Sequence, residues 1–118
     1  MLSEDVRVRA RLSQLAIEIE IAYLLYYKTA WMMDNDLFPN IEASEIKLVT
    51  TLLSRKLADA GMEIMGQQAQ LWPGSRHVPL NGRFAVGYLD SISAVIGAGT
   101  SEIQRNILAQ RGLGLKRK

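Results

Sequence analysis

The sequence predicts an all-α protein, an antiparallel helical bundle that forms one domain over residues 1–118. Long runs without glycine or proline carry apolar residues at steps of three and four, which is the spacing of one helix face. Most breaks between these runs are short, as in bundles whose neighbouring helices are antiparallel. No segment shows the strict alternation of a half-buried strand.

The first predicted helix starts near the N-terminus and runs to about Met33. Ser3 suits an N-cap, and Glu4 and Asp5 place negative charge in the first turn, where the helix dipole favours it. Its apolar stripe consists of Leu12, Leu15, Ile19, Ala22 and Tyr26, widened by Ile17, Ile21, Leu24 and Leu25. A stripe this wide predicts packing against more than one neighbouring helix.

The second predicted helix follows a break at residues 34–39, with Asn40 as its N-cap and Gly66 as its C-cap. Gly61 lies inside this helix, where glycine costs up to ~1 kcal/mol relative to alanine unless a neighbour needs close approach. Its apolar face consists of Ile46, Val49, Leu53, Leu57, Ala60 and Ile64.

Residues 67–81 form the longest irregular segment, with a turn signal at Trp72-Pro73-Gly74-Ser75. We expect a third helix over about residues 82–96. A Gly97-Ala98-Gly99 turn follows, and a fourth helix then runs from Thr100 to about Arg111.

Composition is typical of a soluble globular domain, with 48% hydrophobic residues, 22% charged residues and a net charge of +2. The absence of cysteine excludes disulfides, thiolate catalysis and zinc–cysteine sites. A small net charge argues against a nucleic-acid surface, and no apolar run reaches the ~18–20 residues that cross a bilayer. The charged residues directly after Met1 and Leu2 do not resemble a signal peptide. We therefore expect a cytoplasmic protein without membrane insertion or nucleic-acid partners.

Isolated polar residues give little sign of catalysis. His77 is the only histidine, and the sequence predicts no metal site. Glu18 and Glu20 lie two residues apart, so they face different directions on a helix. The other candidates have structural explanations: packing for Tyr23, Tyr26 and Tyr27, core filling for Met62 and Met65, and solvated charge for Lys47, Arg55 and Lys56.

The stretch Gly97–Arg105 is the strongest candidate site. Its glycine-flanked turn runs straight into a helix whose apolar stripe is Ile103, Ile107 and Leu108. The first N–H groups of a helix have no internal acceptor, and with the helix dipole they favour an anion or a polarised carbonyl. These residues alone are compatible with either a ligand-facing helix start or a plain connector.

The same stretch resembles the C-terminal domain of the flavin-dependent acyl-CoA dehydrogenases. The run Ile96–Arg105, continued by Ile107, Ala109 and Arg111–Gly114, is close to that family's signature for its last two helices. The resemblance covers nearly the whole chain, because four upstream segments match in order and spacing: Leu15–Glu20, Ala30-Trp31, Glu45–Leu48 and Glu63–Gly66.

The resemblance implies the last domain of a three-domain enzyme, which removes a proton α to an acyl-CoA thioester while hydride passes from the β carbon to FAD. Such chemistry needs a carboxylate base, donors that polarise the thioester carbonyl, and a bound flavin. The resemblance makes Ala98 and Gly99 substrate-binding residues, with the Ala98 N–H beside the thioester oxygen. It makes the following residues FAD-binding: Thr100 and Glu102, and, toward the flavin of a neighbouring subunit, Glu63, Met65 and Gly66.

Three departures from the family pattern bear on function. Many members carry the catalytic glutamate where this chain has Ala98, whereas a subset keeps the base on a preceding helix. The resemblance implies that this sequence begins at the second of the usual four helices, so we expect the first of the four to be missing from it. The glycine-rich stretch after the family's second helix reads Gly66-Gln67-Gln68-Ala69 here.

Two functions remain open on this basis, beside a third reading as a generic helical bundle with no relation to flavin. The chain is part of an FAD-dependent acyl-CoA dehydrogenase that supplies bundle, oligomer interface and part of the flavin and thioester wall, with no catalytic residue of its own. Alternatively, it is a non-catalytic interaction module, a base-less subunit that pairs with itself or with a dehydrogenase partner. Under either reading, the isolated chain is expected to be inactive.

Overall fold

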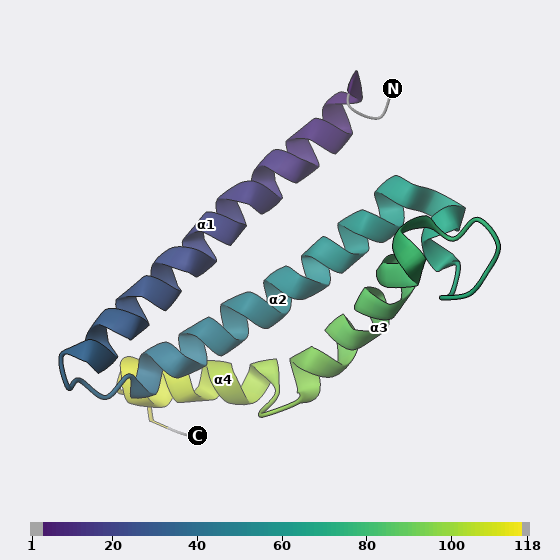
Figure 1. Ribbon diagram of the computed structural model, residues 1–118. Coiled ribbons are helices and arrows are strands. Elements are labelled where there is room, and N and C mark those ends of the chain that lie inside the picture. Colours follow the sequence, from purple (N-terminus) through teal and green to yellow (C-terminus); the bar gives the residue numbers. More distant parts are fainter. Residues whose placement is uncertain (1–3, 117–118) are drawn as a thin grey trace.

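The computed structural model describes residues 4–116 and confirms the all-α class. Its four α-helices are α1 (Val6–Asp34), α2 (Asn40–Met65), α3 (Arg83–Ile96) and α4 (Ser101–Ile107). Within these residues there is no strand. Figure 1 shows α1, α2 and α3 running in alternating directions, with α4 lying across one end of α2. None of the described helices is both long enough and apolar enough to cross a membrane.

Helix α2 is the centre of the molecule, since α1, α3 and α4 each pack against it. The buried core joins α1 to α2 and consists of Leu15, Ala22, Leu53 and Ala60, with Ile19 and Val49 packed beside it. All six belong to the apolar stripes predicted from the 3–4 spacing. The core is small, and much of the apolar surface of α1 lies outside it.

The prediction that the tyrosines of α1 are buried or half-buried packing residues is wrong. Tyr23, Tyr26 and Tyr27 are 54%, 51% and 69% exposed, and Leu12 is 51% exposed. The cause is that α1 packs extensively against α2 alone, so only one of its faces is covered. The expectation that its wide stripe would contact more than one helix is therefore not met in this chain.

Helix α1 begins later than predicted. Its N-cap is Asp5, whose carboxylate accepts a hydrogen bond from the Arg7 N–H at 2.8 Å. Hydrogen bonds from the Arg7 side chain and backbone hold the pKa of Asp5 below its usual value. Asp5 thus caps the helix instead of lying in its first turn, and Ser3, the predicted cap, is outside the described residues.

Helix α2 confirms one predicted cap and corrects the other. Gly66 ends the helix with φ 57°, and its N–H donates to the Met62 carbonyl. At the other end, Asn40 is already helical and Pro39 precedes it without a side-chain cap. The Asn40 Oδ1 instead accepts a hydrogen bond from Arg111 Nη1 at 2.9 Å, which ties the start of α2 to the segment that follows α4.

The three basic residues predicted to be solvated on α2 all make specific contacts. Lys47 Nζ donates to the Ala94 carbonyl of α3 at 2.6 Å. The Arg55 guanidinium lies 4.8 Å from the centre of the Tyr88 ring and donates to the Tyr88 hydroxyl at 3.1 Å. Lys56 Nζ lies 2.8 Å from a Glu18 oxygen of α1. The long side chains reach neighbouring helices, which helix spacing alone does not reveal.

The last helix is shorter than predicted. After Ile107 the chain continues as a π-helical turn, Leu108–Gly112. The Leu113 N–H donates to the Leu108 carbonyl at 3.1 Å, a bond over five residues. Gly112 lies against α2, because a Cβ at this position would stand 3.5 Å from Ile41. The wider turn accompanies this docking of the chain end.

Candidate functional site

The candidate site is the turn between α3 and α4, residues 97–100. Gly97 ends α3, and its N–H donates to the Ser93 carbonyl at 2.9 Å. Ala98 and Gly99 then adopt positive φ values of 54° and 97°, which reverse the chain direction. Thr100 starts α4 as its N-cap, with Oγ1 accepting from the Ile103 N–H at 3.4 Å.

Two side chains, one from α4 and one from α2, support the turn. Gln104 is 7% exposed, and its Nε2 donates to the Ala98 carbonyl at 3.3 Å. Lys47 binds the Ala94 carbonyl at the end of α3. Gly99 leaves room for Gln104, since a Cβ at Gly99 would lie 2.8 Å from Gln104 Nε2. Alanine at φ 54° costs roughly 1–2 kcal/mol, so these contacts keep Ala98 in a conformation that it would otherwise avoid.

The turn presents backbone donors and no carboxylate. Ala98 is exposed, and within residues 4–116 no acceptor is found for the N–H of Ala98 or Gly99. The two predicted substrate-binding residues therefore lie together at the surface, each with an N–H available to an oxygen atom. The nearest acidic side chain in sequence is Glu102, on the first turn of α4.

Glu102 and Thr100, the predicted flavin-binding pair, interact with one another. The pKa of Glu102 lies below its usual value because its own backbone N–H and the Thr100 hydroxyl bind the carboxylate, with a weaker attraction from Arg105. The Arg105 Nη1 lies 3.8 Å from Glu102 Oε1. The carboxylate is exposed and held in its charged form, which makes it a weak proton acceptor.

The second predicted group, Glu63, Met65 and Gly66, is at the C-terminal end of α2, away from the turn. Lys47 marks the level of the turn on α2, and Glu63 lies 16 residues further along, about 24 Å at 1.5 Å per residue. Figure 1 shows the two regions at opposite ends of α3. One ligand group does not contact both, so the structure does not bring the predicted site residues together.

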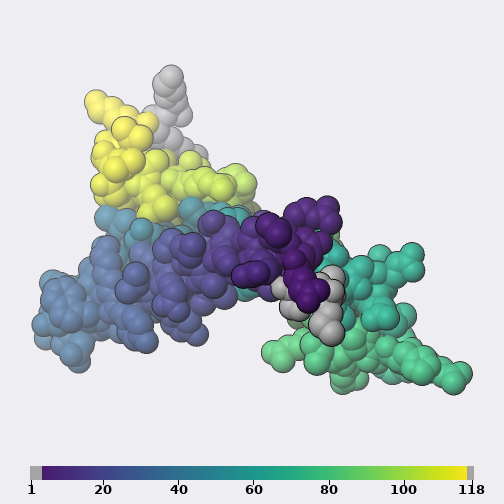
Figure 2. All heavy atoms as spheres, turned by 90° about the horizontal axis from the view of Figure 1, so that it is seen from above, coloured from purple at the N-terminus to yellow at the C-terminus, as the bar shows by residue number. Residues whose placement is uncertain are grey.

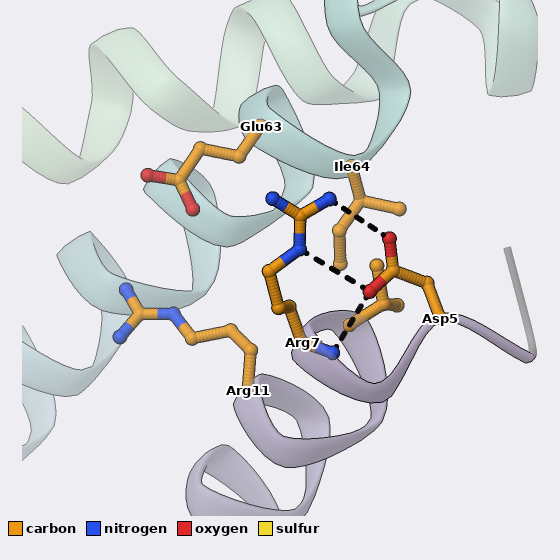
Figure 3. Close-up of a pocket in the computed structure, with 6 residues that line it drawn as sticks. Asp5, Arg7, Arg11, Glu63 and Ile64 are labelled. Carbon is orange, nitrogen blue, oxygen red and sulfur yellow. Dashed lines mark hydrogen bonds and ion pairs between the residues drawn. The ribbon is translucent and has the colours of Figure 1, made fainter.

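Glu63 lines a pocket of about 380 Å³ between α1 and α2, together with Asp5, Arg7, Arg11 and Ile64. Figure 3 shows the Glu63 and Arg11 side chains extending beside one another, while Arg7 is bound to Asp5. The Arg11 Nε is buried and has no partner among the described residues. Two guanidinium groups and two carboxylates leave the pocket near charge balance.

Sequence reasoning missed four side chains that lie around the predicted site residues. Arg7 and Arg11 line the pocket beside Glu63, and Lys47 and Gln104 support the α3–α4 turn. Arg7 and Arg11 are four residues apart and so share a helix face, a spacing that indicated a paired basic site. The roles of Lys47 and Gln104 depend on tertiary contacts that leave no local signal. In the described part of the chain, no three His, Cys, Asp or Glu residues gather closely enough to hold a metal ion.

Comparison with known proteins identifies the class. Residues 1–113 match the family model "Acyl-CoA dehydrogenase, C-terminal domain", and the chain belongs to that family. No curated protein sequence matches the chain.

Solved structures of this class share the fold. The Tcur3481-Tcur3483 steroid ACAD is 25% identical with a TM-score of 0.90, over 98% of this chain and 30% of its own. The ChsE4-ChsE5 complex from Mycobacterium tuberculosis is 26% identical with a TM-score of 0.88, over 99% of this chain and 30% of its own. This chain therefore spans about 30% of the length of those proteins, and the resemblance to an acyl-CoA dehydrogenase C-terminal domain is confirmed.

Proposed function

We propose that this chain forms one wall of the flavin and thioester site of an FAD-dependent acyl-CoA dehydrogenase that acts on the α,β bond of acyl-CoA. The observation that carries the proposal is the α3–α4 turn, where Ala98 and Gly99 present N–H groups at the surface in the segment that resembles the family's signature. Such donors polarise a thioester carbonyl and stabilise the negative charge that develops on its oxygen when the α proton leaves.

The base for this reaction comes from outside the chain's own turn. Ala98 has only a methyl group where many family members carry glutamate. Glu102 is a poor substitute because the Thr100 hydroxyl and its own N–H stabilise its charged form. A useful base has a pKa near the working pH. We therefore assign the turn an electrostatic role and the proton transfer to another segment or subunit.

The α3–α4 turn fits one edge of a flavin better than the end of α2 does. Thr100 and Glu102 offer a hydroxyl and a carboxylate, which suit the polar atoms of FAD and not its phosphates. When bound, FAD would accept the hydride. At the end of α2, the Gly66 N–H is already used in capping, so Glu63 and Met65 would supply the contacts there. The separation of the two groups favours contact with two different flavins, one of them a neighbour's.

A partner subunit is part of this proposal. The similar ChsE4-ChsE5 structure is a complex of two proteins, and a two-protein assembly would allow one chain to lack the base. The same observation favours the alternative function, a non-catalytic interaction module within an acyl-CoA dehydrogenase complex. The two functions differ in whether the α3–α4 turn touches the substrate.

The test is to purify the tagged chain from its own cells and record the visible flavin spectrum, the mass in solution and acyl-CoA-dependent reduction of an artificial electron acceptor. We expect flavin and turnover only in an assembly that contains a second, base-bearing chain. A colourless assembly would favour the interaction module. Turnover by the 118-residue chain alone would overturn both.

A further inference from the structure

Gln104 is a buried polar side chain of α4. It is 7% exposed, in a helix that packs against α2. Figure 2 shows α4, in yellow-green, as a ridge beside the body formed by α1 and α2. An amide buried in this way costs free energy unless it is hydrogen-bonded. Among residues 4–116, the only hydrogen bond of the Gln104 side chain runs from Nε2 to the Ala98 carbonyl, at 3.3 Å.

Gln104 contacts the α3–α4 turn at two points. Its backbone N–H donates to the Thr100 carbonyl at 3.0 Å, and its side chain donates to the Ala98 carbonyl. Gly99 lies between these two acceptors, and a Cβ on Gly99 would stand 2.8 Å from Gln104 Nε2. One residue of α4 therefore fixes the carbonyl of Ala98 and the carbonyl of Thr100, and the turn and the start of the helix form one unit.

The bond to Gln104 also sets the direction of the peptide between Ala98 and Gly99. The described residues contain no cis peptide bond, and the carbonyl and N–H of a trans peptide point in opposite directions. Because the Ala98 oxygen is turned toward the buried Gln104, the Gly99 N–H points to the opposite side. A donor to the carbonyl also polarises the peptide and strengthens its N–H as a donor.

The reverse orientation of this peptide would suit a thioester badly. Gly99 has no side chain, so the peptide before it can rotate with little steric resistance. A rotated peptide would present the Ala98 carbonyl oxygen where the Gly99 N–H now points. An oxygen there would repel the thioester oxygen, on which negative charge develops as the α proton leaves, whereas an N–H stabilises that charge.

We infer that Gln104 is a positioning residue, which keeps the donor side of the Ala98–Gly99 peptide toward the thioester and the Ala98 carbonyl oxygen away from it. The inference rests on the proposed function, since it concerns the same α3–α4 turn. Gln104 acts through Ala98 and Gly99 and does not itself bind the substrate. Its loss should therefore slow the chemical step more than it weakens the binding of acyl-CoA.

Substitution of Gln104 in the purified assembly that contains this chain tests the inference. Gln104→Met keeps the length of the side chain and removes the donor, and kcat per bound flavin should fall about 10-fold or more because the turn loses its alignment. KM should change by less than about twofold, since the lost interaction belongs to the transition state. Gln110→Met, the same change at an exposed glutamine beyond α4, should leave both constants unchanged. Circular dichroism and flavin content verify folding and assembly.

The pH dependence of Gln104→Glu is a readout that a purely structural role would not move. A protonated glutamic acid has an O–H that can donate to the Ala98 carbonyl, whereas the ionised carboxylate cannot donate and repels that oxygen. The rate of Gln104→Glu relative to the wild type should therefore recover as the pH is lowered, and the relative rate of Gln104→Met should stay constant. A relative rate of Gln104→Glu that is independent of pH overturns the inference, and so does a kcat of Gln104→Met equal to that of the wild type.

Infrared difference spectra separate failure of this inference from failure of the proposed function. The probe is an enoyl-CoA, the product of the reaction, isotope-labelled at its thioester carbonyl. Donors on the turn polarise this carbonyl, so its stretching frequency should be lower in the wild-type assembly than in solution, and less lowered in Gln104→Met. No lowering in the wild type would overturn the proposed function. An equal lowering in the wild type and Gln104→Met would overturn only the role of Gln104.

Discussion

The Phe84 ring lies directly against the backbone of Gly61, where a Cβ on Gly61 would be 2.7 Å from Phe84 Cδ1. This close approach joins the start of α3 to the C-terminal part of α2 and explains a glycine within that helix. The sequence predicted this reason for Gly61 without identifying the neighbour. Gly87 on α3 offers a contrast, because a Cβ there would have no heavy atom within 4 Å.

Gly61→Ala should destabilise the protein by about 1–2 kcal/mol, because overpacking against Phe84 exceeds the gain in helix propensity. Gly87→Ala should stabilise it by about 0.5–1 kcal/mol, because propensity acts there alone. Urea unfolding followed by circular dichroism measures both. Equal changes in the two variants would contradict the packing of Phe84 on α2.

Substitutions at the two positive-φ residues of the α3–α4 turn should have different effects on the free energy of unfolding. Gly99→Ala should cost about 1–3 kcal/mol, because alanine is strained at φ 97° and its Cβ would displace Gln104. Ala98→Gly should change stability by less than about 0.5 kcal/mol, since relief of strain offsets the extra entropy of the unfolded chain. Unfolding free energies of the two variants provide the comparison. A large loss in Ala98→Gly would contradict the left-handed conformation of Ala98.

Lys47 should matter more than an ordinary surface lysine. Lys47→Met removes the donor to the half-buried Ala94 carbonyl, and we expect a loss of about 1–2 kcal/mol. Lys28→Met is the control, because Lys28 is 52% exposed and lies 3.5 Å from Glu42, so a change below about 0.5 kcal/mol is expected. Comparable losses in thermal unfolding would show that Lys47 does not anchor α3.

The Glu18–Lys56 pair should make stability depend on acid pH. The hydrogen bond from Lys56 lowers the pKa of Glu18 below 4.5, with a smaller contribution from Gln14. A depressed pKa in the folded state adds stability above pH 4.5, and this stability is lost as pH falls through the folded-state value. The wild type should therefore lose its advantage over Glu18→Gln as the pH falls below the usual pKa of a glutamate. Parallel pH profiles of the two proteins would contradict the pairing.

Much of the fold was predictable because apolar spacing records which residues share a helix face. Leu15, Ala22, Leu53 and Ala60 were found in this way. The cap at Gly66 was found because glycine commonly follows the last turn of a helix. Spacing does not show which of two apolar faces is covered, and this is why Tyr23 and Tyr27 were expected to be buried or half-buried. The preceding bundle helix, implied by the family resemblance, stays a prediction.

The candidate site was predictable only in part. Gly97–Thr100 was found because glycine-flanked turns before a helix have a local signature. The supports of that turn, Lys47 and Gln104, depend on how α2 and α4 meet α3, which no local pattern encodes. The spacing of Arg7 and Arg11 was a local signal, but the position of Glu63 beside them depends on how α1 meets α2. The roles of Ala98, Gly99, Thr100, Glu102, Glu63, Met65 and Gly66 toward substrate and flavin stay predictions.

The most direct test of the central claim is the rate of acyl-CoA-dependent electron-acceptor reduction, per bound flavin, in the assembly that contains this chain. If the α3–α4 turn polarises the thioester, Gly99→Ala should lower that rate by about 10²-fold, because alanine is strained at φ 97° and would shift the Ala98 and Gly99 N–H groups away from the thioester oxygen. Gly87→Ala should leave the rate unchanged. Equal rates per flavin in Gly99→Ala and the wild type would contradict the claim that this turn is a wall of the active site.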